Sequence, residues 1–180
     1  RYMAWESMER EGYEADKIRL YVMDLTTGEK NDFSEGFDQN AEGLKWGDDN
    51  TIWFISDWHA TDEIYSLDIP TGRITKHTDG VHNYTSVIPT GKMLLATKVS
   101  MSKPAEIYKV DPATGKDEEL SFVNKPILDQ LTMGKVEKRW IKTTDNKDML
   151  VWMIYPPHFD PNRKYPAILY CEGGPQSTVS

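Results

Sequence analysis

The chain has 180 residues and a formal net charge of −8, which disfavours nucleic-acid binding because phosphate backbones repel an acidic surface. Hydrophobic residues make up 38% of the composition and aromatic residues 11%, enough for a packed core and too much for a chain disordered throughout. No apolar run approaches the ~20 residues that cross a bilayer as a helix, and the single cysteine, Cys171, excludes an internal disulfide.

The first residues, RYMAWES (1–7), form a strand-like run, and a long polar loop, ESMEREGYEADK (6–17), is predicted to follow. Because the chain opens inside this run at Arg1, we expect it to be a piece of a longer protein. Four carboxylates fall in the predicted loop: Glu6, Glu9, Glu11 and Glu14. Acids in such a loop are able to anchor the amino group of a peptide, but a solvated loop is the favoured interpretation.

Three segments share one frame of tyrosine, two residues, aspartate, three residues and glycine. They are IRLYVMDLTTGEK (18–30), DEIYSLDIPTGRI (62–74) and AEIYKVDPATGKD (105–117). The tyrosines lie 44 and 43 residues apart, and a repeat of this length built from short strands is typical of β-propeller blades. We predict that each tyrosine packs between blades, each aspartate ends a strand, and each glycine supplies the positive φ of a turn.

Between these frames, LKWGDDNTIWFISD (44–57) and SVIPTGKMLLATK (86–98) each predict a strand, a turn and a second strand. The runs 52–55 and 93–96 are apolar on both faces, as expected for inner strands sandwiched between blades. Residues 1–125 are therefore predicted to hold most of one blade, a full blade and a nearly full one. Closed propellers have about four to eight blades, so we expect further blades upstream.

The pattern changes after Phe122. Residues 136–142 predict a strand, 143–148 a polar turn and 149–155 a second strand. The connection PPHFDPNRKYP (156–166) is rich in proline, which excludes a helix or a central strand there. A third strand is predicted at 167–171, with Cys171 as a small buried hydrophobic residue, and a glycine-rich loop follows it. This order is typical of the start of an α/β-hydrolase sheet, so residues 126–180 are predicted to begin a second domain.

A propeller that runs into DNKDMLVWMIYPPHFDPNRKYPAILYCEGGPQS resembles the prolyl oligopeptidase family of serine peptidases, in particular its dipeptidyl and acylaminoacyl peptidase branch. The resemblance covers the whole chain. It implies a propeller that caps an α/β-hydrolase domain and a Ser-His-Asp triad that cleaves peptides without a cofactor. The sequence contains no GxSxG elbow, so no catalytic residue is expected in this chain, and the triad is expected downstream of Ser180.

The resemblance also points to the loop after the third predicted strand. Gly173 and Gly174 are expected on the oxyanion side of the active site, where backbone amides approach the substrate carbonyl. Glu172 departs from the histidine usual in the family. Either it turns away and braces the loop, or it holds the free amino group of the substrate.

Other side chains carry weaker signals. The histidines, His59, His77, His82 and His158, lack the spacing of a metal site, so no metal is expected, and Trp58 with His59 is interpreted as loop decoration.

From the resemblance, the predicted function is that of a fragment of a serine exopeptidase that releases dipeptides from short peptides, inactive by itself. The alternative is a non-catalytic propeller that binds partners, with a degenerate hydrolase tail. Unpaired strand edges predict self-association of the chain, and no compartment is indicated.

Overall fold

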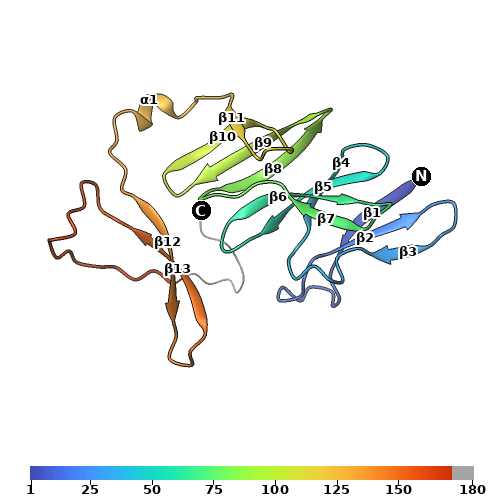
Figure 1. The fold of residues 1–180 in the computed structure, drawn as a ribbon, viewed down its shortest axis with the longest axis horizontal. Helices are drawn as coiled ribbons and strands as arrows, with labels where there is room; N and C mark the ends of the chain where they lie inside the picture. Colours follow the sequence, from blue (N-terminus) through green and yellow to red (C-terminus); the bar gives the residue numbers. More distant parts are fainter. Residues whose placement is uncertain (172–180) are drawn as a thin grey trace.

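The computed structural model describes residues 1–171, and nearly all of its regular structure is β-sheet. The strands form three antiparallel sheets, followed by a separate two-stranded hairpin (Figure 1). The first sheet contains β1 (Tyr2–Ser7), β2 (Arg19–Asp24) and β3 (Lys30–Asp32). The second contains β4 (Glu42–Trp46), β5 (Thr51–Asp57), β6 (Asp62–Asp68) and β7 (Arg73–Lys76). The third contains β8 (Asn83–Thr90), β9 (Met93–Ser100), β10 (Lys103–Val110) and β11 (Asp117–Glu119).

In each sheet the strands lie side by side in chain order, which is the up-and-down order expected of propeller blades. The second sheet holds four strands, as expected for a full blade. The third sheet also holds four, so it is more complete than the sequence predicted.

The repeated aspartate and glycine close the same turn in all three sheets. Gly28, Gly72 and Gly115 have φ of 74°, 69° and 70°, the left-handed region that glycine enters without steric cost. In each turn the glycine amide donates a hydrogen bond of 2.8 Å to the carbonyl of the aspartate four residues earlier. The predicted role of the frame is therefore confirmed.

Two apolar layers hold the sheets together. Between the first and second sheets lie Leu20, Val22, Ala41, Ile52, Phe54, Tyr65, Leu67 and Ile69. Between the second and third sheets lie Ile64, Tyr84, Val87, Leu94, Ala96, Tyr108 and Val110, with Trp53 and Ile55 packed against them. Alternate residues of β5 thus enter different layers, which explains why this strand is apolar on both faces.

The repeated tyrosines occupy these layers. Tyr65 and Tyr108 are buried, and burial raises the pKa of Tyr65 to about 12. Tyr21 is half-buried and stacks on Trp5 with ring centroids 5.5 Å apart. The prediction that each tyrosine packs between sheets is confirmed for the second and third frames.

After the third sheet, a one-turn helix, α1 (Lys125–Leu128), leads to a hairpin of β12 (Val136–Lys142) and β13 (Asp148–Ile154). The two strands pair without interruption from Val136 opposite Ile154 to Lys142 opposite Asp148. Asn146 takes a φ of 63° in the polar turn between them. The two predicted strands and their turn are confirmed.

The third strand predicted after the hairpin is wrong. Residues 167–171 form no regular structure, and the exposed fractions of Ile168 and Leu169 are 96% and 87%. Cys171, expected to be buried, is exposed. An apolar run forms a strand only when a neighbouring strand accepts its hydrogen bonds, and the described residues place none beside it.

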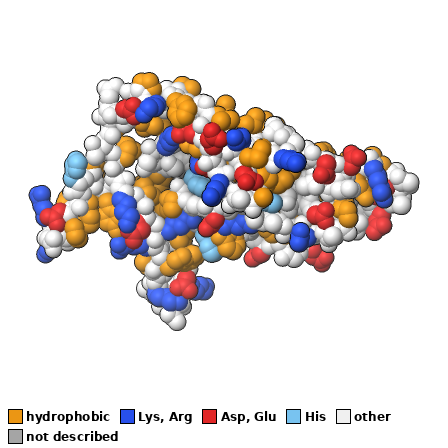
Figure 2. Space-filling view, turned by 45° about the horizontal axis from the view of Figure 1, so that its top comes forward, with side chains coloured by type: hydrophobic (Ala, Val, Ile, Leu, Met, Phe, Trp, Pro, Cys, Tyr) orange, Lys and Arg blue, Asp and Glu red, His pale blue; other side chains and the backbone are white. Residues whose placement is uncertain are grey.

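Apolar side chains remain uncovered on the third sheet and in the segment that follows it, and Figure 2 shows hydrophobic side chains exposed along the top of the molecule. Ile88, Ile107, Phe122, Val123 and Ile127 are each about half exposed or more. Exposed apolar side chains in this number favour association.

We therefore expect the 180-residue chain to self-associate in sedimentation velocity, with a share of oligomer that rises with concentration. Replacing Ile107 with lysine should reduce that share, because a charge then interrupts the apolar surface. A single monomeric species across the concentration range would contradict the expectation.

Candidate functional site

The strand ends of each sheet lie on two opposite sides, and these two sides carry different connections. Because neighbouring strands are antiparallel, the strand ends on one side carry the Asp–Gly turns, and the strand ends on the opposite side carry residues 8–18, 33–41, 58–61 and 77–82. Each such row of strand ends is called an edge. The β12–β13 hairpin contacts the second of these edges, since the ring of Trp140 lies edge-on to His59 with centroids 5.3 Å apart. We call this the hairpin-side edge.

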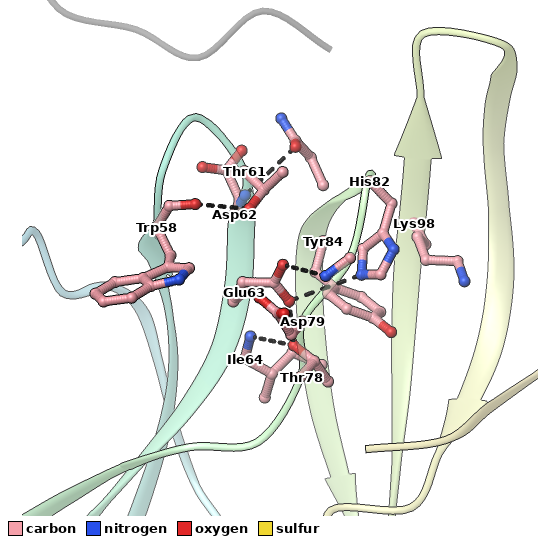
Figure 3. A network of polar contacts seen from close by, with 12 residues as sticks. Trp58, Thr61, Asp62, Glu63, Ile64, Thr78, Asp79, His82, Tyr84 and Lys98 are labelled. Carbon is pink, nitrogen blue, oxygen red and sulfur yellow. Dashed lines mark hydrogen bonds and ion pairs between the residues drawn. The ribbon is translucent and has the colours of Figure 1, made fainter. Parts of the chain in front are cut away.

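A buried polar cluster lies on the hairpin-side edge of the second sheet (Figure 3). The hydroxyl of Thr78 accepts a hydrogen bond of 2.9 Å from the amide of Ile64 and donates one of 2.6 Å to Glu63 Oε2. The other oxygen of Glu63 accepts from the amide of Gly80 at 3.1 Å. We call this arrangement of hydroxyl, amide and carboxylate the clasp. It leaves the Glu63 carboxylate with 0% exposure and a partner on each oxygen.

The clasp recurs in the third sheet. Ser121 accepts from the amide of Ile107 at 2.8 Å and donates to Glu106. Glu106 also accepts from the amide and the side-chain nitrogen of Asn124, at 2.8 and 3.0 Å. These hydrogen bonds, that of Ser121 foremost, lower the pKa of Glu106 to about 2.

The first sheet keeps the hydroxyl and changes the acid. Ser34 accepts from the amide of Leu20 at 2.9 Å and donates to Asp32 at 2.7 Å. Arg19 stands where the other frames have Glu63 and Glu106, with Nη1 4.0 Å from Asp32 Oδ2. The serine or threonine lies 13 residues after each repeated tyrosine. This regular spacing is a sequence signal for the clasp, which was not predicted from the sequence.

The clasp of the second sheet has an aromatic and charged surround. His82 Nε2 lies 3.7 Å from Glu63 Oε2, and its ring is edge-on to Tyr84 at 4.9 Å. The Tyr84 hydroxyl donates to Asp117 at 2.7 Å, and burial together with that carboxylate raises the pKa of the phenol. The cluster is thus a fixed network that fastens the second sheet to the third.

The long loop of residues 8–18 is closed by an internal ion pair and is joined to residues 34–37 by Lys17. Arg10 pairs with Asp16, with Nη2 2.6 Å from Oδ1, and Lys17 Nζ donates to the carbonyls of Ser34 and Phe37 at 2.7 and 2.8 Å. The remaining acids of this loop, Glu9, Glu11 and Glu14, are exposed, as the interpretation of a solvated loop predicted. These three carboxylates face solvent on the hairpin-side edge.

The placement of Glu6 in that loop is wrong. Glu6 lies in β1, and its Oε1 accepts from the amides of Gly43 and Leu44 at 2.8 and 3.3 Å. The carboxylate therefore joins the first sheet to β4 of the second, because the two amides at the start of β4 need an acceptor.

The turn at residues 58–61 adopts a strained conformation. His59 and Ala60 both have positive φ, 50° and 59°, where glycine or asparagine is usual in a two-residue hairpin. The turn carries Trp58 and His59, whose rings lie 4.2 Å apart, and the His59 ring also contacts Trp140 of the hairpin. These residues, interpreted from the sequence as loop decoration, form part of the contact between the hairpin and the second sheet.

The residues predicted to carry chemistry, Glu172, Gly173 and Gly174, lie outside the described residues. Within residues 1–171, no three histidine, cysteine, aspartate or glutamate side chains are grouped to hold a metal ion. Across the same residues, no helix combines the length and apolar content needed to span a bilayer.

No protein-family model matches the chain. The sequence is 44% identical over 179 residues to dipeptidyl-peptidase 5 of Porphyromonas gingivalis, covering 99% of this chain and 26% of that protein. The fold is similar to Pyrococcus horikoshii acylaminoacyl peptidase, with a TM-score of 0.70 and 19% identity over 86% of this chain and 24% of that one. It is also similar to the β-propeller domain of the Trilobed protease from Pyrococcus furiosus, with a TM-score of 0.56 and 18% identity over 71% of this chain and 37% of that one.

The chain thus spans about a quarter of the length of the curated relative. The fold similarities confirm the predicted partial propeller, and the three sheets are its blades. The sequence similarity confirms the predicted resemblance to the prolyl oligopeptidase family.

The third clasp makes stability depend on pH. Because the pKa of Glu106 falls from its ordinary 4.5 to about 2 on folding, its stabilising effect is complete above about pH 4.5 and is lost as the pH falls toward 2. In urea unfolding between pH 5 and pH 2, the free energy of unfolding should fall more steeply with decreasing pH in the wild type than in Glu106→Gln. The difference in slope corresponds to up to one additional proton taken up when the wild type unfolds. Equal slopes would show that the clasp does not hold the carboxylate ionised.

Proposed function

We propose that this chain forms the last blades of a propeller and the first strands of an α/β-hydrolase domain in a serine exopeptidase of the prolyl oligopeptidase family. The observation that carries the proposal is the 44% identity to dipeptidyl-peptidase 5 over 99% of the chain. Residues 1–125 then belong to the propeller and 126–180 to the start of the peptidase domain. The division is supported by the last blade strand ending at Glu119 and by the uninterrupted hairpin that starts at Val136.

In this proposal, peptides bind between the propeller and the peptidase domain, and a serine attacks the bond that releases a dipeptide. The acyl-enzyme is then hydrolysed, with histidine moving the proton and aspartate orienting it. All three groups lie outside this chain, so the 180 residues are inactive alone. No cofactor takes part.

The loop of residues 172–174 contributes to the same site. Amides at Gly173 and Gly174 line the oxyanion side, because glycine lets the backbone approach the substrate carbonyl. Glu172 either braces this loop or accepts the free amino group of the peptide. Loss of activity toward free-amine peptides alone in Glu172→Gln supports the second role, and unchanged kinetics support the first.

The hairpin-side edge gives the propeller its part in the reaction. It faces the hairpin that opens the peptidase domain, so residues 8–18 and 58–61 border the space that a peptide enters. The tight fastening of the 8–18 loop by Arg10, Asp16 and Lys17 suits a wall that selects peptides by size. Short peptides are the substrates that pass.

A fluorophosphonate probe tests the proposal, because it labels only a serine activated by its base. We expect no labelling of the 180-residue chain, and one labelled serine in a longer protein that extends this sequence. Prior incubation with a short peptide substrate should slow the labelling. A folded longer protein that takes no label would instead favour the non-catalytic binding propeller.

A further inference from the structure

The β12–β13 hairpin contacts the second blade through the ammonium group of Lys138. Lys138 Nζ lies 3.4 Å from Thr61 Oγ1 and 3.5 Å from the carbonyl oxygen of Gly80, both on the hairpin-side edge of the second blade. The ammonium also lies 5.3 Å from the ring of Trp152, the residue opposite Lys138 in the hairpin. Trp140, two residues along the same strand, contacts His59 of the same blade.

The receiving surface is the clasp of the second blade. Gly80 donates its amide to Glu63 and presents its carbonyl to Lys138, so the backbone of one residue connects the buried carboxylate to the cation. Glu63 and Asp79 both attract the ammonium, and its partial burial lowers the pKa of Lys138 against their pull. A half-buried lysine placed here is therefore held by charge as well as by the ring beneath it.

The other two clasps do not offer this surface. Glu106 accepts hydrogen bonds from Ser121 and from the amide and side-chain nitrogen of Asn124, all of which directly follow the third blade. In the first blade, Arg19 brings its own positive charge to the same position of the repeat. Among the described residues, the acidic clasp contacted by a cation from the hairpin is that of the second blade.

We propose that the clasp of the second blade is a docking site for the hairpin, and that Lys138 is the positioning residue that latches it there. The inference rests on the proposed function, in which the hairpin opens the peptidase domain. The latch then fixes that domain over the propeller and sets the width of the gap through which a peptide enters. Lys138 takes no part in bond cleavage.

Hydrogen exchange of the hairpin amides in the 180-residue chain tests the latch. We expect Lys138→Met to speed exchange across residues 136–154 by about three- to tenfold, because the methyl thioether still covers Trp152 but no longer donates to the blade. Lys138→Arg should restore most of the protection. Lys142→Met is the matched control, since Lys142 lies on the same strand and its ion pair with Asp148 stays within the hairpin.

A second pair of variants separates docking from general loss of stability. Glu63→Gln and Glu106→Gln alter equivalent clasps, but we expect only Glu63→Gln to speed exchange of the hairpin. In the Lys138→Met background, Glu63→Gln should add nothing further, because the two residues act through one contact. Protection of the β9 amides serves as the check that the blades stay folded.

Two results would overturn the latch. One is unchanged hairpin exchange in Lys138→Met, and the other is an equal effect of Glu63→Gln and Glu106→Gln. If Glu63→Gln unfolds its blade, the Lys138 variants decide alone, since that side chain lies outside the blade core. The exchange experiment needs no peptidase activity, so its failure is distinct from a failure of fluorophosphonate labelling.

Discussion

The hydroxyl clasp is the contact on which each blade depends. The outer strands are short: β3 has three residues, β7 four and β11 three, so each has few ladder hydrogen bonds. The hydroxyl of Ser34, Thr78 or Ser121 takes the next amide of the neighbouring strand after that ladder ends. A buried amide without an acceptor costs about 1–3 kcal/mol, so at Leu20 and Ile64, whose amides are buried, one side chain both extends the pairing and removes that penalty.

The clasp also directs the chain out of one blade and into the next. It sits on the hairpin-side edge, where residues 33–41 and 77–82 leave an outer strand and enter the inner strand of the following blade. The three clasps share the hydroxyl and differ in the acid and its surroundings. The hydroxyl contact is thus common to the three blades, and the clasp of the second blade also contacts the hairpin, through Gly80 and Lys138.

The sequence predicted what depends on local chemistry. The Asp–Gly turns and the hairpin strands follow from residues within a few positions of one another, and the apolar faces of β5 follow from its composition. The clasp was missed because each hydroxyl lies 14 residues after the amide that donates to it. Its acid also comes from different strands, Asp32 in one blade and Glu63 in another. Glu6 was misplaced for a related reason, since its partners, Gly43 and Leu44, belong to another sheet. The strand at 167–171 failed because pairing needs a neighbour, which composition does not reveal.

The central claim, that the clasp closes each blade, is tested most directly by residue-resolved amide exchange of Leu20, Ile64 and Ile107. These amides donate to the clasp hydroxyls at 2.9, 2.9 and 2.8 Å and sit at the ends of their ladders. The account predicts that all three are protected as strongly as amides in the middle of β5 and β9. Exchange at the rate of the exposed turn amides at Thr26 and Ala113 would contradict it.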